Sequence, residues 1–256
     1  GNEIILSSQK NGQIRKKVID LSEWKILHRR LLLNAYLQGY DEVEIKFNDP
    51  KMQRIEAVKE LIPIELLGFE IIKQTPNSIT VKEISAPTTE NFDTILKRIF
   101  MMIDSLAHEL INSLNSNIKN LDHIISMDKP INRFCNYATR ILYKNGYTDN
   151  RKIPSLFSTI QILERIADYY RDLAKYIVSK KIKLNKEDIK NIEMVNNLFK
   201  LIEETFLFYD KDKMHNLIRN YLEVKDKLNE ESKIYPYLNQ IIEYIIMLNN
   251  NILITI

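Results

Sequence analysis

The sequence predicts an α+β domain over residues 1–86 followed by an all-helical domain over residues 90–256. Three observations carry this prediction. Polar–apolar alternation and β-branched runs characterise the first 85 residues or so, whereas helical periodicity continues from there to the end. The 256 residues also include only 5 Gly and 7 Pro, so turn-forming residues are scarce. This composition is typical of long helices joined by few loops.

The front domain begins with a strand and a helix. Residues 17–21 include β-branched side chains and predict a strand. The next apolar residues recur at helical spacing and are followed by Gly39, which stands where a C-cap glycine belongs; they are Leu27, Leu31, Leu32, Ala35 and Tyr36. Residues 41–47 alternate polar and apolar side chains, which predicts a half-buried strand.

The rest of the front domain repeats this order. Asp49-Pro50 opens a second helix, whose apolar face is Ile55, Val58, Leu61 and Ile62. Two further strands, 69–72 and 78–84, flank Pro76-Asn77 and predict an antiparallel hairpin. The element order is therefore β-α-β-α-β-β with a mixed sheet. Its first two strands are joined by a helix and should lie parallel or in a split arrangement.

The helical domain reads as six segments in two sets of three. Breaks fall near residues 116–117, 145–147, 183–185, 209–210 and 232–233. A weak repeat aligns Leu163–Asp168 with Ile242–Met247, each in the third segment of its set. Short breaks between long amphipathic helices predict two three-helix bundles, over about 90–181 and 186–256.

Composition and charge exclude several classes. The net charge of +3 is too small to indicate nucleic-acid binding by this chain. Cys135 is the single cysteine, which excludes an internal disulfide and predicts a reducing, cytoplasmic location. No apolar run is long enough to span a bilayer. The chain begins at Gly1 without an initiating Met, from which we expect that an upstream part of the natural protein is missing.

Known catalytic patterns do not occur in the sequence, so we expect a protein that is not an enzyme. The chain contains neither a Gly-rich phosphate loop nor a Gly-x-Ser-x-Gly elbow. Cys135 has apolar neighbours on a helix face and is expected to be a buried small hydrophobe. The histidines do not stand at metal-ligand spacing; they are His28, His108, His123 and His215.

Several motifs resemble those of the PhoU domain family, whose members have two three-helix bundles. Residues 163–168 match the family motif Leu-Glu-Arg-Ile-x-Asp. The acidic pairs on the second helices of the two bundles correspond to Asp128 with Asn132 and to Asp226 with Glu230. The stretches 34–42 and 67–71 are similar to the α+β segment of archaeal members. Those members carry an AbrB-type DNA-binding domain upstream, and residues 3–6 look like its last strand.

The resemblance implies a metal site, because family members can bind iron or zinc clusters at the acidic motifs. Its candidate ligands are Asp128, Glu164 and Asp168, with Asp226, Glu230 and Glu243 as weaker candidates. Asn132 and Met247 stand where the family has acids. We therefore expect no firmly held cofactor and at most a weakly bound divalent metal, with Mg²⁺, Ca²⁺ or Fe favoured over Zn²⁺.

A second interpretation of the same residues needs no metal. Glu164 and Asp168 lie four residues apart and face one side of a helix. They could instead pair with Arg165, Arg171 or Lys175 on the bundle surface, since such pairs are common on helices.

The resemblance also implies a function. It indicates a non-catalytic regulator of phosphate uptake and signalling that contacts a phosphate transporter ATPase subunit or a sensor kinase. We expect a homodimer formed through the front domain. The alternative is a transcription regulator whose AbrB-type DNA-binding domain lies upstream of this chain. This part would then be its sensor and dimerisation module.

Overall fold

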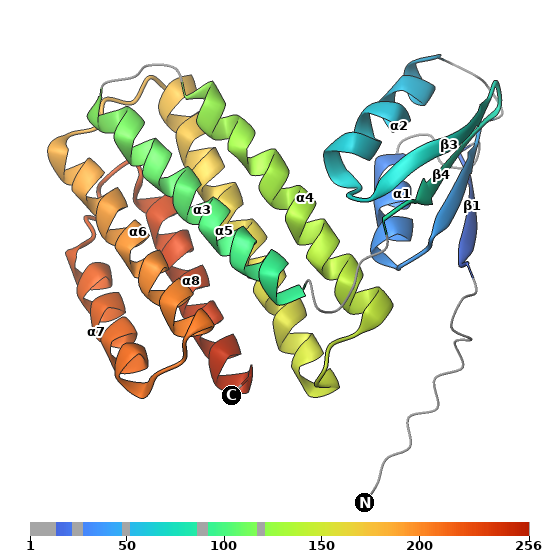
Figure 1. Ribbon diagram of the computed structural model, residues 1–256. Coiled ribbons are helices and arrows are strands. Elements are labelled where there is room, and N and C mark those ends of the chain that lie inside the picture. The colour runs from blue at the N-terminus through green and yellow to red at the C-terminus, as the bar shows by residue number, and fades with distance from the viewer. Residues whose placement is uncertain (1–13, 22–27, 48–51, 86–91, 117–120, 256) are drawn as a thin grey trace, which may run out of the picture. The chain divides into compact units, whose positions relative to one another are not determined.

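The computed structural model describes residues 14–21, 28–47, 52–85, 92–116 and 121–255 (Figure 1). The chain divides into two compact units, Gly1–Ala86 and Pro87–Ile256. The predicted strand remnant at residues 3–6 and the helix start at Asp49-Pro50 lie outside the described residues.

The front unit contains a four-stranded mixed sheet in the order β1-β2-β4-β3. Strand β1 (Lys16–Asp20) is parallel to β2 (Glu42–Lys46), and β4 (Ser78–Glu83) is antiparallel to both β2 and β3 (Phe69–Thr75). The predicted order of strands and helices, the mixed sheet and the hairpin are confirmed. The parallel first pair follows from the helix that connects β1 to β2.

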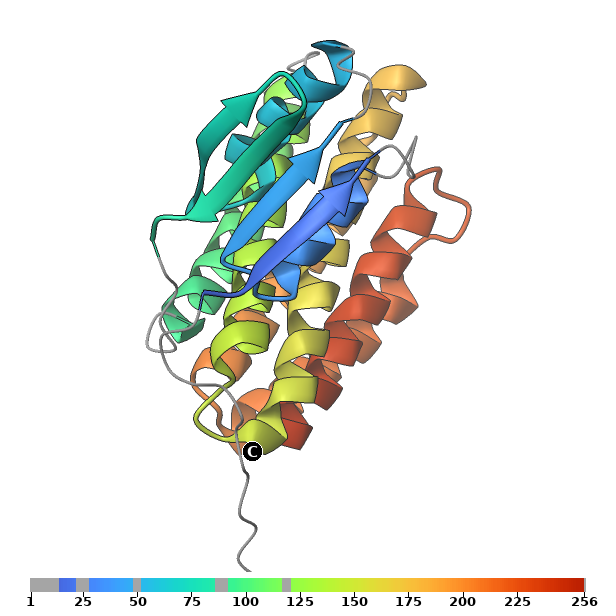
Figure 2. The same ribbon diagram turned by 90° about the vertical axis from the view of Figure 1, so that its right-hand side faces the viewer.

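Helices α1 (His28–Leu37) and α2 (Met52–Glu65) lie on one face of this sheet (Figure 2). Buried side chains of the sheet, among them Ile19, Ile45 and Val81, form the core together with Leu32 and Val58 of the helices. This core follows from the period-2 pattern of the strands and the helical period of α1 and α2.

Two glycines close turns in the front unit. Gly39 has φ 78°, and its N–H donates to the carbonyl of Tyr36 at 3.0 Å, so the predicted C-cap glycine of α1 is confirmed. Gly68 has φ 84°, and a Cβ at that position would lie 2.8 Å from the Ser85 carbonyl oxygen. Both positions therefore favour glycine, which has no Cβ to strain or clash.

The second unit consists of helices throughout its described residues, and the six predicted segments are confirmed. They are α3 (Phe92–Asn115), α4 (Asp122–Asn145), α5 (Ile153–Ser179), α6 (Lys186–Leu207), α7 (Lys211–Lys227) and α8 (Tyr235–Thr255), with a short 3₁₀ turn η2 (Asn150–Lys152) before α5. Polar side chains start two of these helices. Asn185 forms a capping box with Asp188 at α6, and Asp210 accepts two backbone N–H groups at α7.

Short connections join consecutive helices, and within each set of three a helix packs against the one that follows it. Helix α3 contacts α4, α5 and α6, and α4 contacts α5. Helix α8 contacts α5, α6 and α7, and α6 contacts α7. Their apolar stripes are buried, as Ile103 of α3, Leu163 of α5 and Ile241 of α8 illustrate. Among the described residues, no helix is long and apolar enough to cross a membrane.

Candidate functional site

The three main site residues predicted from the sequence lie on two adjacent helices. Asp128 is on α4, and Glu164 and Asp168 are one turn apart on α5. Asp128 is 4% exposed, whereas Glu164 and Asp168 are half-buried. Because α4 packs against α5, their carboxylates are brought to one interhelical surface.

Arg171 of α5 is the centre of this cluster. Its Nη1 donates to Asp128 Oδ2 at 2.8 Å and also to Asp168 Oδ1. Its Nε donates to Asp172 Oδ1 at 2.9 Å. One guanidinium thus binds carboxylates from both helices, an arrangement for which its fixed fork of donors is suited. We call Asp128, Asp168, Arg171 and Asp172 the Arg171 cluster.

The outer members of the cluster are held by more exposed cations. Arg165 Nη1 lies 3.5 Å from Asp168 Oδ2, and Lys175 Nζ lies 3.7 Å from Asp172 Oδ1. The ion pairs predicted for Asp168 are therefore confirmed, since it contacts both Arg165 and Arg171. Sequence reasoning missed Asp172, although its position four residues after Asp168 places it on the same helix face.

Burial and charge shift the ionisation of this cluster. Burial raises the pKa of Asp168, Arg171 lowers it, and the negative charge of Asp128 raises it again, so the pKa lies above its usual value. For Arg171, burial lowers the pKa, but the hydrogen bonds to Asp172 and Asp128 outweigh it and raise the pKa. Arg171 is therefore a permanent cation, and the carboxylates it binds are its counterions.

Two oxygen atoms in the cluster region are buried with no protein hydrogen-bond partner in the described parts of the chain. They are Oδ1 of Asp128 and Oδ1 of Asn132. Asn132 donates its Nδ2 to Asp128 Oδ2 at 3.0 Å. That donor satisfies one Asp128 oxygen without adding negative charge.

Cys135 lies on α4, seven residues after Asp128, and is 1% exposed. Burial raises the pKa of its thiol, and the charges of Glu164, Asp128 and Asp168 raise it further. A thiol that stays protonated is neither a nucleophile nor a metal ligand. The prediction of a buried small hydrophobe is confirmed.

The predicted metal site is not assembled in this arrangement. Within the described ranges, no three His, Cys, Asp or Glu side chains form a group that could hold a metal ion. Asp128 and Asp168 bind the Arg171 guanidinium instead. A divalent metal at Asp128, Glu164 and Asp168 stays a prediction, and it would require Arg171 to move away.

The weaker candidates lie on α7, on α8 and in the turn between them, because α7 ends at Lys227, before Glu230. Glu243 of α8 pairs with Lys225 of α7 at 2.8 Å. Glu230 accepts a long hydrogen bond from the Tyr235 hydroxyl at 3.5 Å, and Asp226 is exposed on α7. Hydrogen bonds to Glu243 and to Tyr221 raise the pKa of Lys225. The Glu243 carboxylate is therefore bound to Lys225 in this structure, not to other candidate metal ligands.

A second polar cluster joins α3 to α6 and lies close to α5. Asp104 of α3 accepts from Asn196 Nδ2 at 3.4 Å and lies 3.6 Å from Lys200 Nζ. The Tyr170 hydroxyl of α5 is buried, and burial and the charge of Asp104 raise its pKa. Sequence reasoning did not find this cluster, because its residues come from three helices whose mutual register no short motif reveals.

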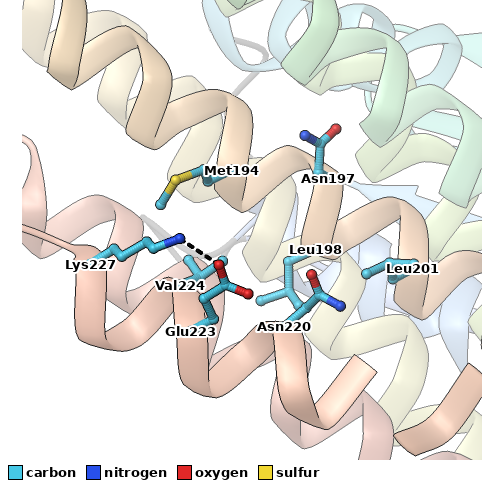
Figure 3. Close-up of a pocket in the computed structure, with 8 residues that line it drawn as sticks. All are labelled: Met194, Asn197, Leu198, Leu201, Asn220, Glu223, Val224 and Lys227. Atoms are coloured by element: carbon cyan, nitrogen blue, oxygen red, sulfur yellow. Dashed lines mark hydrogen bonds and ion pairs between the residues drawn. The ribbon is translucent and has the colours of Figure 1, made fainter. Parts of the chain in front are cut away.

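Helices α6 and α7 enclose a shallow groove of about 130 Å³ (Figure 3). Its lining residues are Met194, Asn197, Leu198, Leu201, Asn220, Glu223, Val224 and Lys227. On its α7 side, Lys227 donates a hydrogen bond to Glu223 one turn earlier, and this hydrogen bond lowers the pKa of the glutamate. A carboxylate whose pKa is lowered in this way is a poor general base at neutral pH.

Comparisons with protein-family models, with curated proteins and with solved structures gave no match for this chain. The resemblance to the PhoU domain therefore depends on the quoted residues and on the order of elements.

Proposed function

We propose that the protein is a non-catalytic regulator that acts by protein–protein contact, in the manner of PhoU-type regulators of phosphate uptake and signalling. The observation that carries this proposal is the Arg171 cluster. Asp128 and Asp168, which belong to the stretches that resemble the family, are both bound by Arg171 where α4 contacts α5. Such a cluster fixes a surface for recognition and leaves no free nucleophile or base within it.

The arrangement of helices supports the same proposal. Helices α3, α4 and α5 contact one another pairwise, and so do α6, α7 and α8. We therefore propose that they form the two three-helix bundles of the resemblance. The third helices of the two sets meet through two pairs of tilted tyrosine rings, Tyr169 with Tyr244 at 5.7 Å and Tyr176 with Tyr237 at 5.2 Å between ring centroids. The residue numbers of these pairs rise along α5 and fall along α8, so the two helices are antiparallel. This orientation is expected for two similar units that face each other.

The surface of the Arg171 cluster suits a protein partner. Arg165 and Lys175 are 64% and 50% exposed and border half-buried carboxylates. Tyr169 and Tyr176 lie half-exposed on the same helix. Tyrosine and arginine are enriched at the centres of protein interfaces. The partner we propose is the ATPase subunit of a phosphate transporter or a phosphate sensor kinase.

The test is a binding measurement between the purified chain and each of these two proteins from its own organism. Biolayer interferometry should detect binding to at least one of them. The variant Arg165→Glu should weaken it, because it reverses an exposed charge beside the cluster. Lys211→Glu, an exposed change at the start of α7, is the matched control and should bind normally. If the folded chain binds neither protein, the proposal is refuted.

A further inference from the structure

Strand β1 is at one end of the strand order β1-β2-β4-β3, so among the described residues it is an edge strand of the front sheet (Figure 2). In a parallel pair, alternate residues of a strand bond to the neighbouring strand. The Arg15 carbonyl accepts from the Glu42 N–H at 3.2 Å, and the Leu21 N–H donates to the Lys46 carbonyl at 2.9 Å. By this alternation, the odd-numbered residues bond to β2. The backbone groups of residues 16, 18 and 20 therefore point toward the outer edge.

The side chains of these three residues share one face of the sheet. Ile19 is buried on the opposite face against the helices, whereas Val18 is 55% exposed at the centre of β1. Lys16 and Asp20 stand on either side of Val18 at equal spacing. The exposed face of the edge strand therefore has a basic, an apolar and an acidic side chain in succession.

Charges alternate across the sheet toward this edge. In one row, Glu70 of β3 lies opposite Lys82 of β4, which lies opposite Glu42 of β2, which lies opposite Lys16 of β1. The signs run negative, positive, negative, positive. Lys16 Nζ contacts Glu42 at 2.9 Å, and its side chain is 61% exposed. An acidic residue opposite Lys16 on an added strand would continue this alternation.

In a second row across the sheet, the edge residue is an acid, so a basic residue would complement it. Asp20 of β1 lies in register with Lys46 of β2. A strand added at this edge would continue the alternation with a basic residue opposite Asp20. The complementary strand therefore has an acid opposite Lys16 and a base opposite Asp20, four residues apart. A second copy of β1 that runs antiparallel has its own Asp20 and Lys16 at these two positions.

We propose that two copies of the chain associate through their β1 strands, paired antiparallel about Val18. Lys16 then lies opposite the partner's Asp20, Asp20 lies opposite the partner's Lys16, and the two Val18 side chains meet on the axis. All of these residues direct their backbone groups to the edge, so the pairs can exchange main-chain hydrogen bonds. Such a contact is isologous and closes as a two-fold dimer. It rests on the homodimer that we expect for the proposed function.

The register and the choice of edge follow from the same residues. A shift of the axis to Lys17 or Ile19 would place Val18 opposite a charged residue and would lose both charge pairs. The other edge strand, β3, has a register irregularity between Ile71 and Lys73. Irregularities of this kind hinder the addition of a further strand, so β1 is the edge suited to pairing.

Two charge reversals test the interface. Lys16→Asp places two acids opposite each other in both rows, and Asp20→Lys places two bases there. Each variant alone should dimerise roughly tenfold more weakly, since two attractive cross-strand pairs become repulsive. When the two variants are mixed, every acid again faces a base. A heterodimer should then form with close to native affinity and should be visible by native mass spectrometry.

The control pair is Glu70→Lys and Lys73→Asp on β3, which are exposed and lie on the opposite edge. These variants should dimerise like the native chain in sedimentation velocity over a dilution series. Far-UV circular dichroism checks that every variant is folded. Native dimers that survive both β1 reversals would overturn this interface but leave the dimer of the proposed function in place. A native chain that is monomeric throughout would refute both. Weakened variants that fail to pair when mixed would overturn the antiparallel register.

Discussion

Replacing Arg171 with Met should destabilise the helical unit more than the loss of any surface ion pair. The substitution keeps an apolar stem and removes the cation between α4 and α5. The side chains of Asp128 and Arg171 are only 6% and 19% exposed, so Asp128 would be left buried without its counterion. Removing one partner of a buried pair costs about 3–5 kcal/mol. Because Arg171 keeps some solvent contact, we expect a loss of about 2–4 kcal/mol at neutral pH.

The pH dependence of this loss separates charge from packing. In the native chain, the pKa of Asp168 lies above its usual value. An acid of this kind favours folding below its unfolded pKa, and that contribution disappears as the pH rises through its folded pKa. Without Arg171, whose charge lowers the pKa of Asp168 in the native chain, that pKa should rise further. Asp168 would then be neutral over more of the acidic range, so the penalty of the variant should shrink from neutral pH toward about pH 4.5.

Urea unfolding followed by circular dichroism at both pH values measures the effect. Arg165→Met is the matched control. Arg165 is 64% exposed and 3.5 Å from Asp168, so its loss should cost less than about 1 kcal/mol. Asp128→Asn should partly rescue Arg171→Met, since it removes the stranded charge. A penalty under about 1 kcal/mol for Arg171→Met, or one that is equal at both pH values, would refute the role we assign to this cation.

Four further outcomes are expected. Cys135 should react slowly with a thiol reagent in the native chain and rapidly in urea, as followed by absorbance, because it is buried and its pKa is raised. Gly68→Ala should lower the free energy of unfolding by roughly 1–3 kcal/mol, because φ is positive and the added Cβ would meet the Ser85 carbonyl. Asn185→Ala should cost about 1 kcal/mol through the lost cap of α6, measured by the same urea titration. Calorimetry with Mg²⁺ or Ca²⁺ should show weaker binding to the native chain than to Arg171→Met, since the guanidinium competes with the metal for the same carboxylates.

The main features of the fold could be predicted because they depend on local patterns. The period-2 strands, the hairpin at Pro76-Asn77 and the Gly39 cap are each encoded within a few residues. The six helices could be delimited because breaks in a 3.6-residue period leave a direct trace in the sequence. Mixed strand pairing followed from connection length alone, since a helix between β1 and β2 favours a parallel pair.

The candidate site was less accessible to such reasoning, because it depends on contacts between helices. Spacing on α5 placed Asp168 within reach of Arg165 and Arg171, and both contacts occur. The contact of Arg171 with Asp128 spans 43 residues and depends on the register of α4 against α5. A pattern within one helix does not determine that register. The same acidic residues were therefore compatible with the ion-pair hypothesis and also with the metal-site hypothesis.

Polar contacts between neighbouring helices specify the register in which those helices pack. The apolar stripes of this unit are rich in Leu and Ile, which have similar volumes, so apolar packing alone specifies a unique register only weakly. A polar or charged contact joins one helix to the next at several interfaces: Arg171–Asp128 between α5 and α4, Lys200–Asp104 between α6 and α3, Asn251–Thr159 between α8 and α5, and Lys225–Glu243 between α7 and α8.

These contacts differ in what they contribute. Lys225 and Glu243 are 48% and 39% exposed, so their pair adds little stability and a slipped register would cost little there. Asp128 and Asn251 are 4% and 8% exposed, and a slip would leave them buried without partners. Unsatisfied buried polar groups penalise the wrong register more strongly than the correct pairs stabilise the right one. The Arg171 cluster therefore serves mainly to fix α4 against α5, and the surface that we propose for partner recognition depends on that fixed register.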